Sequence, residues 1–229
     1  MYLVTAATEY EMKPFLAACG SEGFSHLLTG VGPLETAVRL SSRLHGHGEN
    51  VAAVINFGVA GAYAHTGSPG PGLLDICLAE REVMGDLGIC LHDRIERLTG
   101  KELGVPDSFI MDHLMLREAG EVLRAERIAY YSGTFVTVNC ASGTAERGAM
   151  LAMQHEGLCE NMEGAAVARV CSAFALPCLE IRCISNMVED RDTGRWQLQK
   201  ACVRAARVTA SVVRHLVGMR PELPAGTGT

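Results

Sequence analysis

Residues 51–63 read VAAVINFGVAGAY. The first six are almost all apolar, which is typical of a strand buried on both faces of a parallel sheet. Upstream, TGVGP (29–33) follows a candidate strand at 26–29 and leads through Pro33 into a helix that the apolar spacing predicts over Leu34–Leu44. Strand, glycine turn, helix and strand in this order predict a layered α/β fold with a largely parallel sheet.

The same reading extends along the chain. Further strands are predicted at Tyr2–Thr8, Leu73–Ala79, Thr134–Val138 and 176–186, and helices at Leu114–Ala125, Glu163–Phe174 and Trp196–Val217. Residues 85–112 have weak periodicity and scattered charge, which favours an excursion from the sheet or a lid. Because neither a repeat nor a linker interrupts the pattern, one domain is predicted over 1–219, followed by a flexible tail at 220–229.

The composition excludes several classes of protein. Of the 229 residues, 48% are hydrophobic and 20% are charged, as in globular domains and unlike disordered chains. A net charge of −6 without a Lys/Arg cluster argues against a nucleic-acid partner. The uncharged stretch 51–74 contains prolines, glycines and an asparagine that interrupt any membrane helix, so no membrane partner is expected.

Cysteine usage indicates the compartment. There are nine cysteines, mostly in apolar stretches and never as Cys-x-x-Cys, which predicts buried free thiols, a cytoplasmic location and no zinc site. HGH (45–47) is interpreted as a loop at a helix end rather than a metal site. The N-terminus lacks the basic and long apolar regions of a signal peptide.

Four segments carry unusual polar residues at strand or helix ends: TAATEYE (5–11), NFGVAGAY (56–63), ENMEGAAVA (160–168) and EIRCISNMVEDRD (180–192). In sheets of this kind ligands bind at the carboxyl ends of strands, so a site is predicted where these segments meet. Each has a simpler explanation. NFGVAGAY suits a strand-to-helix turn that needs small residues, and Glu163 suits a first-turn carboxylate facing the helix dipole. A buried Glu163 would instead need donors, such as two sugar hydroxyls.

In combination and order, these segments resemble the purine nucleosidase and nucleoside phosphorylase family, over about residues 2–217. The resemblance rests on NMEGAAVARVC (161–171), IRCISNMVEDRD (181–192), INFGVAGAY (55–63) and TGVGP (29–33). It implies a three-layer α/β/α sandwich with a mixed central sheet. It also implies a small nucleoside substrate, hydrolysis of an N-glycosidic bond without metal or other cofactor, and a homo-oligomer, dimer or larger.

The resemblance also implies roles for individual residues. Glu11, in the Glu-x-Glu at the end of the first predicted strand, matches the carboxylate that takes a proton from the attacking water. Glu163 matches the residue that binds the ribose 2′- and 3′-hydroxyls, with Met162 beside the sugar. Arg182 matches an arginine that helps to place the water.

Other matching residues concern the purine. Ser185 matches a neighbour that orients the residue contacting the base, and Ala60 and Gly61 match substrate-binding positions. Phe135 and Val136 fall near the segment that stacks on the base, with the register open by one or two residues. These assignments follow from the resemblance alone.

One position departs from the adenine-specific members, which carry Asp where this chain has Asn186. A carboxylate only accepts hydrogen bonds, whereas an amide also donates and so suits a 6-oxopurine. A carboxylate facing the 6-oxygen would cost about 1–3 kcal/mol or more per unpaired group. Asn186 could also be a simple cap after a strand. An amide here is similar to the futalosine hydrolase branch, which releases hypoxanthine in an alternative route to menaquinone.

The 5′ side of the substrate and the rival functions stay open. Arg191 or Arg195 could anchor a carboxylated aromatic tail, and Pro106 and Phe109 are weak candidates for its apolar wall. Rival enzymes are a 6-oxopurine nucleoside phosphorylase and a methylthioadenosine/adenosylhomocysteine nucleosidase. The phosphorylase is disfavoured because ATEYEMKP lacks a Gly-Asp-Pro phosphate pocket. A nucleoside-binding module without chemistry is the rival from another class.

Overall fold

The computed structural model describes residues 1–20, 22–46, 50–64, 70–96, 98 and 104–219. Helices run over Glu9–Cys19 (α1), Pro33–Gly46 (α2), His113–Ala125 (α3), Ala145–His155 (α4), Gly164–Ala173 (α5) and Leu198–Gly218 (α6), with a 3-10 turn at Thr193–Arg195 (η1). Strands run over Tyr2–Ala6 (β1), Phe24–Leu28 (β2), Ala53–Ala62 (β3), Ile76–Met84 (β4), Ile89–Cys90 (β5), Ile95–Glu96 (β6), Ser108–Ile110 (β7), Tyr130–Thr137 (β8), Gly157–Asn161 (β9) and Cys178–Met187 (β10).

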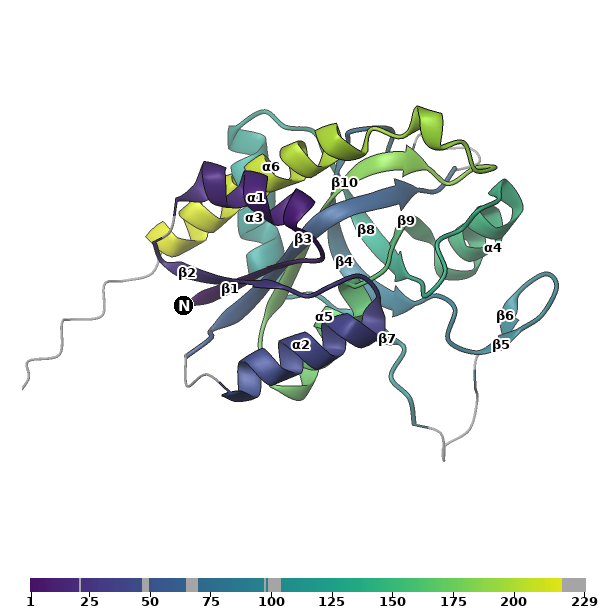
Figure 1. Ribbon diagram of the computed structural model, residues 1–229, viewed down its shortest axis with the longest axis horizontal. Helices are drawn as coiled ribbons and strands as arrows, with labels where there is room; N and C mark the ends of the chain where they lie inside the picture. The colour runs from purple at the N-terminus through teal and green to yellow at the C-terminus, as the bar shows by residue number, and fades with distance from the viewer. Residues whose placement is uncertain (21, 47–49, 65–69, 97, 99–103, 220–229) are drawn as a thin grey trace, which may run out of the picture.

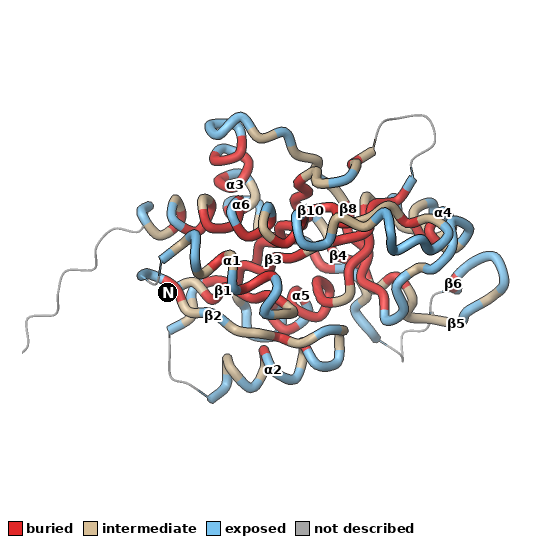
Figure 2. Tube along the Cα trace, turned by 45° about the horizontal axis from the view of Figure 1, so that its top comes forward, coloured by how far each residue is buried: buried red, intermediate tan, exposed pale blue. Residues whose placement is uncertain are grey.

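Helices cover both faces of one mixed sheet, which confirms the three-layer α/β/α prediction. Figure 1 shows α1, α3 and α6 on one face, α2 and α5 on the other, and α4 beyond one end of the sheet. One apolar cluster packs α1, α3 and α6 against the sheet. A second packs α2 and α5 against the opposite face. The buried part of the chain in Figure 2 therefore follows the central strands and α5.

The sheet has eight strands, in the order β10-β4-β8-β9-β3-β1-β2 with β7 on β4. Strand β10 pairs parallel with β3 and antiparallel with β4, so this path closes on itself. Strand β1 also lies parallel to β3. Because β1, β3 and β10 run in the same direction, their carboxyl ends meet at one edge, where the site is expected.

Strand β3 corrects the prediction that a turn follows VAAVIN. The strand continues through Ala62, because its second half pairs with both β10 and β9. Its small residues leave room for side chains from neighbouring elements. A Cβ atom at Gly58 would lie 2.5 Å from Oε1 of Glu11 and 2.8 Å from Nη1 of Arg182. Close approach, and not a turn, therefore explains the glycine at this position.

Outside residues 85–112, one strand and two α-helices were absent from the sequence prediction: β9, α1 and α4. Helix α1 contains Pro14, which removes a backbone donor and disguises the helical pattern. Strand β9 is only five residues long, and it ends in the buried polar residues Glu160 and Asn161. Polar residues in so short a segment hide the apolar pattern on which strand prediction depends.

Residues 85–112 leave the main sheet only in part. They form the β5–β6 hairpin and then β7, which pairs with β4. Residues 97 and 99–103 of the predicted lid lie outside the described residues, as do His47 of the HGH segment and the predicted tail 220–229. In the part of the chain that is described, no helix combines the length and apolar character needed to cross a bilayer.

Candidate active site

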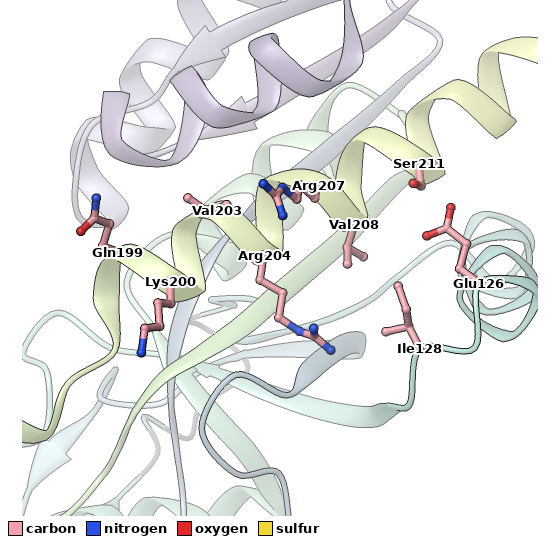
Figure 3. A pocket seen from close by; sticks show the side chains of 9 residues that line it. All are labelled: Glu126, Ile128, Gln199, Lys200, Val203, Arg204, Arg207, Val208 and Ser211. Carbon is pink, nitrogen blue, oxygen red and sulfur yellow. The ribbon is translucent and has the colours of Figure 1, made fainter.

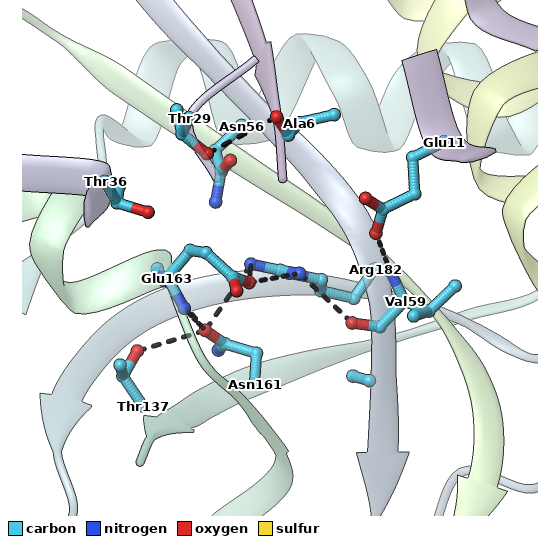
Figure 4. A network of polar contacts seen from close by, with 12 residues as sticks. Ala6, Glu11, Thr29, Thr36, Asn56, Val59, Thr137, Asn161, Glu163 and Arg182 are labelled. Carbon is cyan, nitrogen blue, oxygen red and sulfur yellow. Dashed lines mark hydrogen bonds and ion pairs between the residues drawn. The ribbon is translucent and has the colours of Figure 1, made fainter. Parts of the chain in front are cut away.

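Three of the predicted charged residues converge at the carboxyl ends of β1, β3 and β10. Figure 4 shows the side chains of Glu11, Glu163 and Arg182 approaching one another from α1, from the segment before α5 and from β10. They are 4%, 5% and 2% exposed, respectively. Segments 5–11, 56–63, 160–168 and 180–192 therefore meet, as the strand-end argument predicts.

Arg182 is the centre of this arrangement. Its Nη1 and Nη2 atoms lie 3.3 and 3.4 Å from Oε2 of Glu163. Nη1 also donates to the carbonyl oxygen of Val59 at 3.1 Å, and Nε donates to Oε1 of Glu180 at 2.8 Å. Burial alone would lower the pKa of Arg182, but the carboxylates of Glu180, Glu163 and Glu11 raise it. The guanidinium is thus permanently charged and held rigidly.

Glu163 stands at the N-cap position of α5, but its carboxylate makes no capping bond. Oε2 faces Arg182, and Oε1 accepts a hydrogen bond from the backbone N–H of Gly32 at 3.1 Å. Asn161 Oδ1 does the capping, because it accepts from the N–H groups of Glu163 and Gly164 at 2.9 and 2.7 Å. The helix-dipole explanation of Glu163 is therefore insufficient: a buried cation and a loop amide hold this carboxylate.

Glu11 lies in the first turn of α1, which corrects its expected place at the end of a strand. Its Oε2 accepts from the N–H and Oγ1 of Thr8 at 3.0 and 2.8 Å, which ties the helix start to the carboxylate. Its Oε1 accepts from the N–H of Val59 at 3.2 Å. Burial raises the pKa of Glu11 above its ordinary value, although Arg182 and Thr8 oppose the shift.

The residues expected to meet the purine lie further along β10. Asn186 is half-buried, and its register partner on β3 is Gly61. A Cβ atom at Gly61 would lie 3.0 Å from Nδ2 of Asn186. Ser185 Oγ donates to Oδ1 of Asn186 at 2.8 Å, which is the contact that an orienting role requires. Nδ2 donates to the carbonyl oxygen of Met187 at 3.2 Å.

The other predicted substrate-binding residues differ in burial and in their distance along the chain from the charged site. Ala60 is 4% exposed, on the same strand as Gly58, and Met162 is half-buried directly before Glu163. Phe135 and Val136 are 0% exposed and belong to two different apolar clusters. Their contact with the base stays a prediction, and the open register also admits the residues that follow Val136.

Sequence reasoning missed the polar layer behind the charged residues. It consists of Thr137, Asn161, Glu82 and Glu180, all buried. Thr137 Oγ1 and Asn161 Nδ2 lie 2.8 and 2.6 Å from the carboxylate oxygens of Glu82. One signal was available in the sequence. Glu180 and Arg182 are two residues apart in an apolar strand and therefore share a face, which indicates a buried ion pair.

Two cavities border helix α6. One, of about 540 Å³, lies between α6 and the segment after α3; it includes Lys200, Arg204 and Arg207 and has no residue in common with the charged site (Figure 3). The other, of about 930 Å³, lies between the starts of α1 and α6. Thr8, which binds Glu11, lines this second cavity. The second cavity is therefore the one beside the predicted catalytic base.

Its walls are mainly apolar, with polar groups among them. The lining residues are Thr8, Glu9, Tyr10, Lys13, Pro14, Leu198, Gln199, Cys202 and Val203. Neither predicted anchor of a carboxylated tail is among them. Arg195 forms an ion pair with Glu189 at 2.8 Å, and the Arg191 guanidinium lies 5.7 Å from the ring centre of Trp196.

Comparisons with known proteins agree with this geometry. The profile of the phosphorylase superfamily matches residues 4–218. Futalosine hydrolase of Thermus thermophilus is 32% identical over 93% of this chain and 92% of its own length. 5′-Methylthioadenosine/S-adenosylhomocysteine nucleosidase of Staphylococcus saprophyticus is 26% identical over 81% and 79%. The Helicobacter pylori nucleosidase of the same name, solved in complex with a substituted pyrrolidin-3-ol, superposes with a TM-score of 0.81 at 19% identity, covering 93% and 97% of the two chains.

Proposed function

Because the chain belongs to the phosphorylase superfamily, we propose that its buried Glu11–Arg182–Glu163 site hydrolyses the N-glycosidic bond of futalosine. The products are hypoxanthine and dehypoxanthine futalosine, and the reaction would belong to menaquinone biosynthesis. The observation that carries the proposal is the convergence of two carboxylates on one guanidinium beside Gly58. The relatives supply the reaction class, and the identity of 32% to a futalosine hydrolase favours that substrate.

Glu11 acts as the general base for water. A base works best when its pKa approaches the working pH, and burial moves the pKa of Glu11 in that direction. The Val59 N–H and Thr8 hold both of its oxygens, so the carboxylate has little freedom to rotate. Fixed geometry of this kind avoids an entropic cost when water attacks.

Glu163 binds the ribose hydroxyls and supports the positive charge that develops on the sugar. Its Oε2 accepts from Arg182 and its Oε1 from the N–H of Gly32, and each oxygen has a further lone pair that can accept from a ribose hydroxyl. The ion pair with the guanidinium fixes the orientation of the Glu163 carboxylate. Because these charges are oriented before the reaction, they stabilise the transition state without further rearrangement.

Asn186 discriminates the base. Ser185 donates to Oδ1 of Asn186, and Nδ2 donates one hydrogen to the carbonyl oxygen of Met187, which leaves the second Nδ2 hydrogen for the base. Such a donor pairs with the 6-oxygen of hypoxanthine, and the bond strengthens as negative charge moves onto the departing purine. A 6-amino group would instead meet another donor.

The 5′ extension of futalosine ends in an aromatic carboxylate, and the cavity of about 930 Å³ has matching chemistry. Tyr10, Pro14 and Leu198 supply an apolar wall. Lys13 lies at the same cavity and forms an ion pair with Glu9; its side chain is 75% exposed, so it can turn toward a ligand carboxylate. Lys13 replaces Arg191 and Arg195 as our proposed anchor.

The experiment that tests the function is incubation of the purified protein with futalosine, inosine and methylthioadenosine, with chromatography of the released base. We expect hypoxanthine from futalosine, at the same rate with and without phosphate. Phosphate-dependent release from inosine would instead identify a phosphorylase, and adenine release from methylthioadenosine the other nucleosidase. Binding of all three without release of a base would identify a non-catalytic module.

We also expect a homo-oligomer in the cytoplasm. Leu34 and Val38, four residues apart on α2, are 79% and 55% exposed, which supports a contact with another subunit. All nine cysteines are free, which supports a reducing compartment. Light scattering of the purified protein tests the oligomer, and a monomeric mass would contradict it.

A further inference from the structure

Two buried carboxyl groups, those of Glu82 and Glu180, meet beside Arg182. Glu82 comes from β4 and Glu180 from β10, and they are 0% and 1% exposed. A Cβ atom at Gly164 would overlap with carboxylate oxygens of both residues. The two groups therefore face one another at the start of α5, and glycine at position 164 makes room for them.

The hydrogen bonds around this pair leave one oxygen unpaired. Oε1 of Glu180 accepts from Nε of Arg182 at 2.8 Å and from Nδ2 of Asn56 at 3.1 Å. Glu82 accepts from Asn161 and Thr137. Oε2 of Glu180 is buried and has no donor. A buried anionic oxygen without a donor is costly, and a proton between the two carboxyl groups removes that cost.

The charges around this pair also favour a proton between the two carboxyl groups. One guanidinium, that of Arg182, faces Glu11 and Glu163 as well as Glu180. A further ionised carboxylate at position 82 would add repulsion that Arg182 alone does not offset. We propose that Glu82 and Glu180 share one proton, and that this acid–carboxylate pair is a positioning device for Arg182 and Glu163.

The pKa directions support the shared proton. Burial raises the pKa of Glu82 well above its ordinary value, the charge of Glu180 raises it further, and Thr137 and Asn161 oppose the shift. Burial also raises the pKa of Glu180, against the charge of Arg182. The charge of Arg182 also opposes the shift of the Glu82 pKa. A further titratable group that faces Glu82 is the thiol of Cys159, whose pKa burial raises well above its ordinary value. That thiol is neutral and supplies no compensating charge.

The pair reaches the catalytic groups by two routes. Glu180 holds Nε of Arg182, whose other nitrogens hold Glu163. Glu82 holds the amide of Asn161, whose oxygen accepts from the N–H of Glu163. Both carboxyl groups are buried, so in this proposal they act through Arg182 and Asn161. The positioning role rests on the proposed function, whereas the shared proton does not.

Infrared spectroscopy of the free protein tests the proton directly and needs no substrate. We expect the C=O band of a protonated carboxylic acid at neutral pH in the wild type, and its loss in both Glu82→Gln and Glu180→Gln. In each variant the new amide donates to the remaining carboxylate, so no proton is needed. Glu11→Gln is the control, because it removes a buried carboxyl group that does not belong to the pair. This variant should keep the band. Absence of the band in the wild type, or its persistence in both amide variants, overturns the shared proton.

Thermal unfolding against pH gives a second readout. The folded pair keeps its proton at a pH where the unfolded carboxyl groups have lost theirs, so stability falls as pH rises above the ordinary Glu range. Glu82→Gln should remove this part of the slope. An unchanged slope in that variant contradicts the proposal.

Futalosine turnover tests the positioning. Glu82→Ala leaves Asn161 without its acceptor, and misplacement of this kind lowers kcat by about 10²-fold. Glu82→Gln keeps an acceptor and the charge of the pair, so we expect it to recover most of that loss. Equal loss in both variants overturns the positioning role. If Glu82→Ala does not fold, a Glu82→Gln/Glu180→Gln double variant tests the same role, because it removes the charge beside Arg182. We expect its kcat to fall below that of Glu82→Gln, and equal values overturn the positioning role.

Discussion

Strand β10 presents two site residues, four positions apart, in contrasting surroundings. Arg182 is buried and contacts two carboxylates, a backbone carbonyl and the Asn161 amide oxygen. Asn186 is half-buried, and its side-chain hydrogen bonds go only to its neighbours Ser185 and Met187 among the described residues. The half of the site that we propose breaks the bond is thus rigid and connected, whereas the half that we propose contacts the base has few side-chain partners. Changes in the first half should slow every substrate, and changes in the second should alter which base is accepted.

The largest expected effect is that of Glu11→Gln in the rigid half. Loss of the general base should lower kcat by about 10²–10⁴-fold for every nucleoside that is turned over. The measurement is the steady-state rate of hypoxanthine release from futalosine. Glu121→Gln is the control, because Glu121 is exposed on α3, lies near Arg117 and lines neither cavity of α6. Turnover by Glu11→Gln at the wild-type rate would exclude the water-activating role.

Gly58→Ala should have the next largest effect. Its new methyl group would push against Glu11 and Arg182, and a displacement of this kind costs about 10²-fold in kcat. Gly46→Ala is the control, because nothing lies within 4 Å of a Cβ atom there. If kcat of Gly58→Ala equals that of the control, Glu11 and Arg182 can accommodate the methyl group without loss of activity, and close approach at Gly58 is not required.

Asn186→Asp tests the half of the site that we propose contacts the base. Replacing a donor by a carboxylate should cost about 1–3 kcal/mol with a 6-oxopurine, which is roughly five- to 160-fold in kcat/KM. Activity toward a 6-aminopurine nucleoside should fall less or rise. The ratio of the two kcat/KM values is the measurement, with exposed Asn50→Asp as the control. An unchanged ratio would count against base reading by Asn186.

Thr8→Ala should change the pH profile more than the maximal rate. Glu11 works ionised, so kcat/KM rises with pH through the pKa of Glu11. The Thr8 hydroxyl lowers that pKa, so its removal moves the acid limb of the profile to higher pH. Thr144→Ala removes a comparable helix cap on α4 and should leave the limb in place. If the acid limb does not move, the Thr8 hydroxyl does not lower the pKa of Glu11.

The smallest expected effect is that of Lys13→Met at the cavity beside Glu11. An exposed ion pair contributes about 0.2–1 kcal/mol, so KM for futalosine should rise by up to roughly fivefold. KM for inosine, which lacks the tail, should stay constant. Lys200→Met in the other cavity of α6 is the control. An equal rise for both substrates would place the tail elsewhere.

Much of the fold followed from patterns of nearby residues. Helix α2 begins at Pro33 as expected, and β10 covers nearly all of the predicted apolar run. Helix α1 and strand β9 were missed, because Pro14 and the polar end of β9 obscure their local patterns. The continuation of β3 was also missed, because its pairing partners β9 and β10 come more than ninety residues later.

The site residues also fall into a group that the sequence indicated and a group that it did not. Glu11, Glu163, Arg182 and Asn186 were chosen because their short motifs match those of the family that the chain resembles. Glu82 and Asn161 were not chosen, because single polar residues in apolar or short strands look unremarkable in a sequence.

The sequence alone predicted the layered fold, the family and four candidate charged or amide side chains, because periodicity and motifs are local properties of the chain. Only the tertiary structure decided that Arg182 holds Glu163, that Glu11 lies in the first turn of a helix beside Gly58, and that Glu82 meets Glu180. These contacts join residues that are distant in the chain, and their strength depends on burial, which arises only when the sheet closes and excludes water.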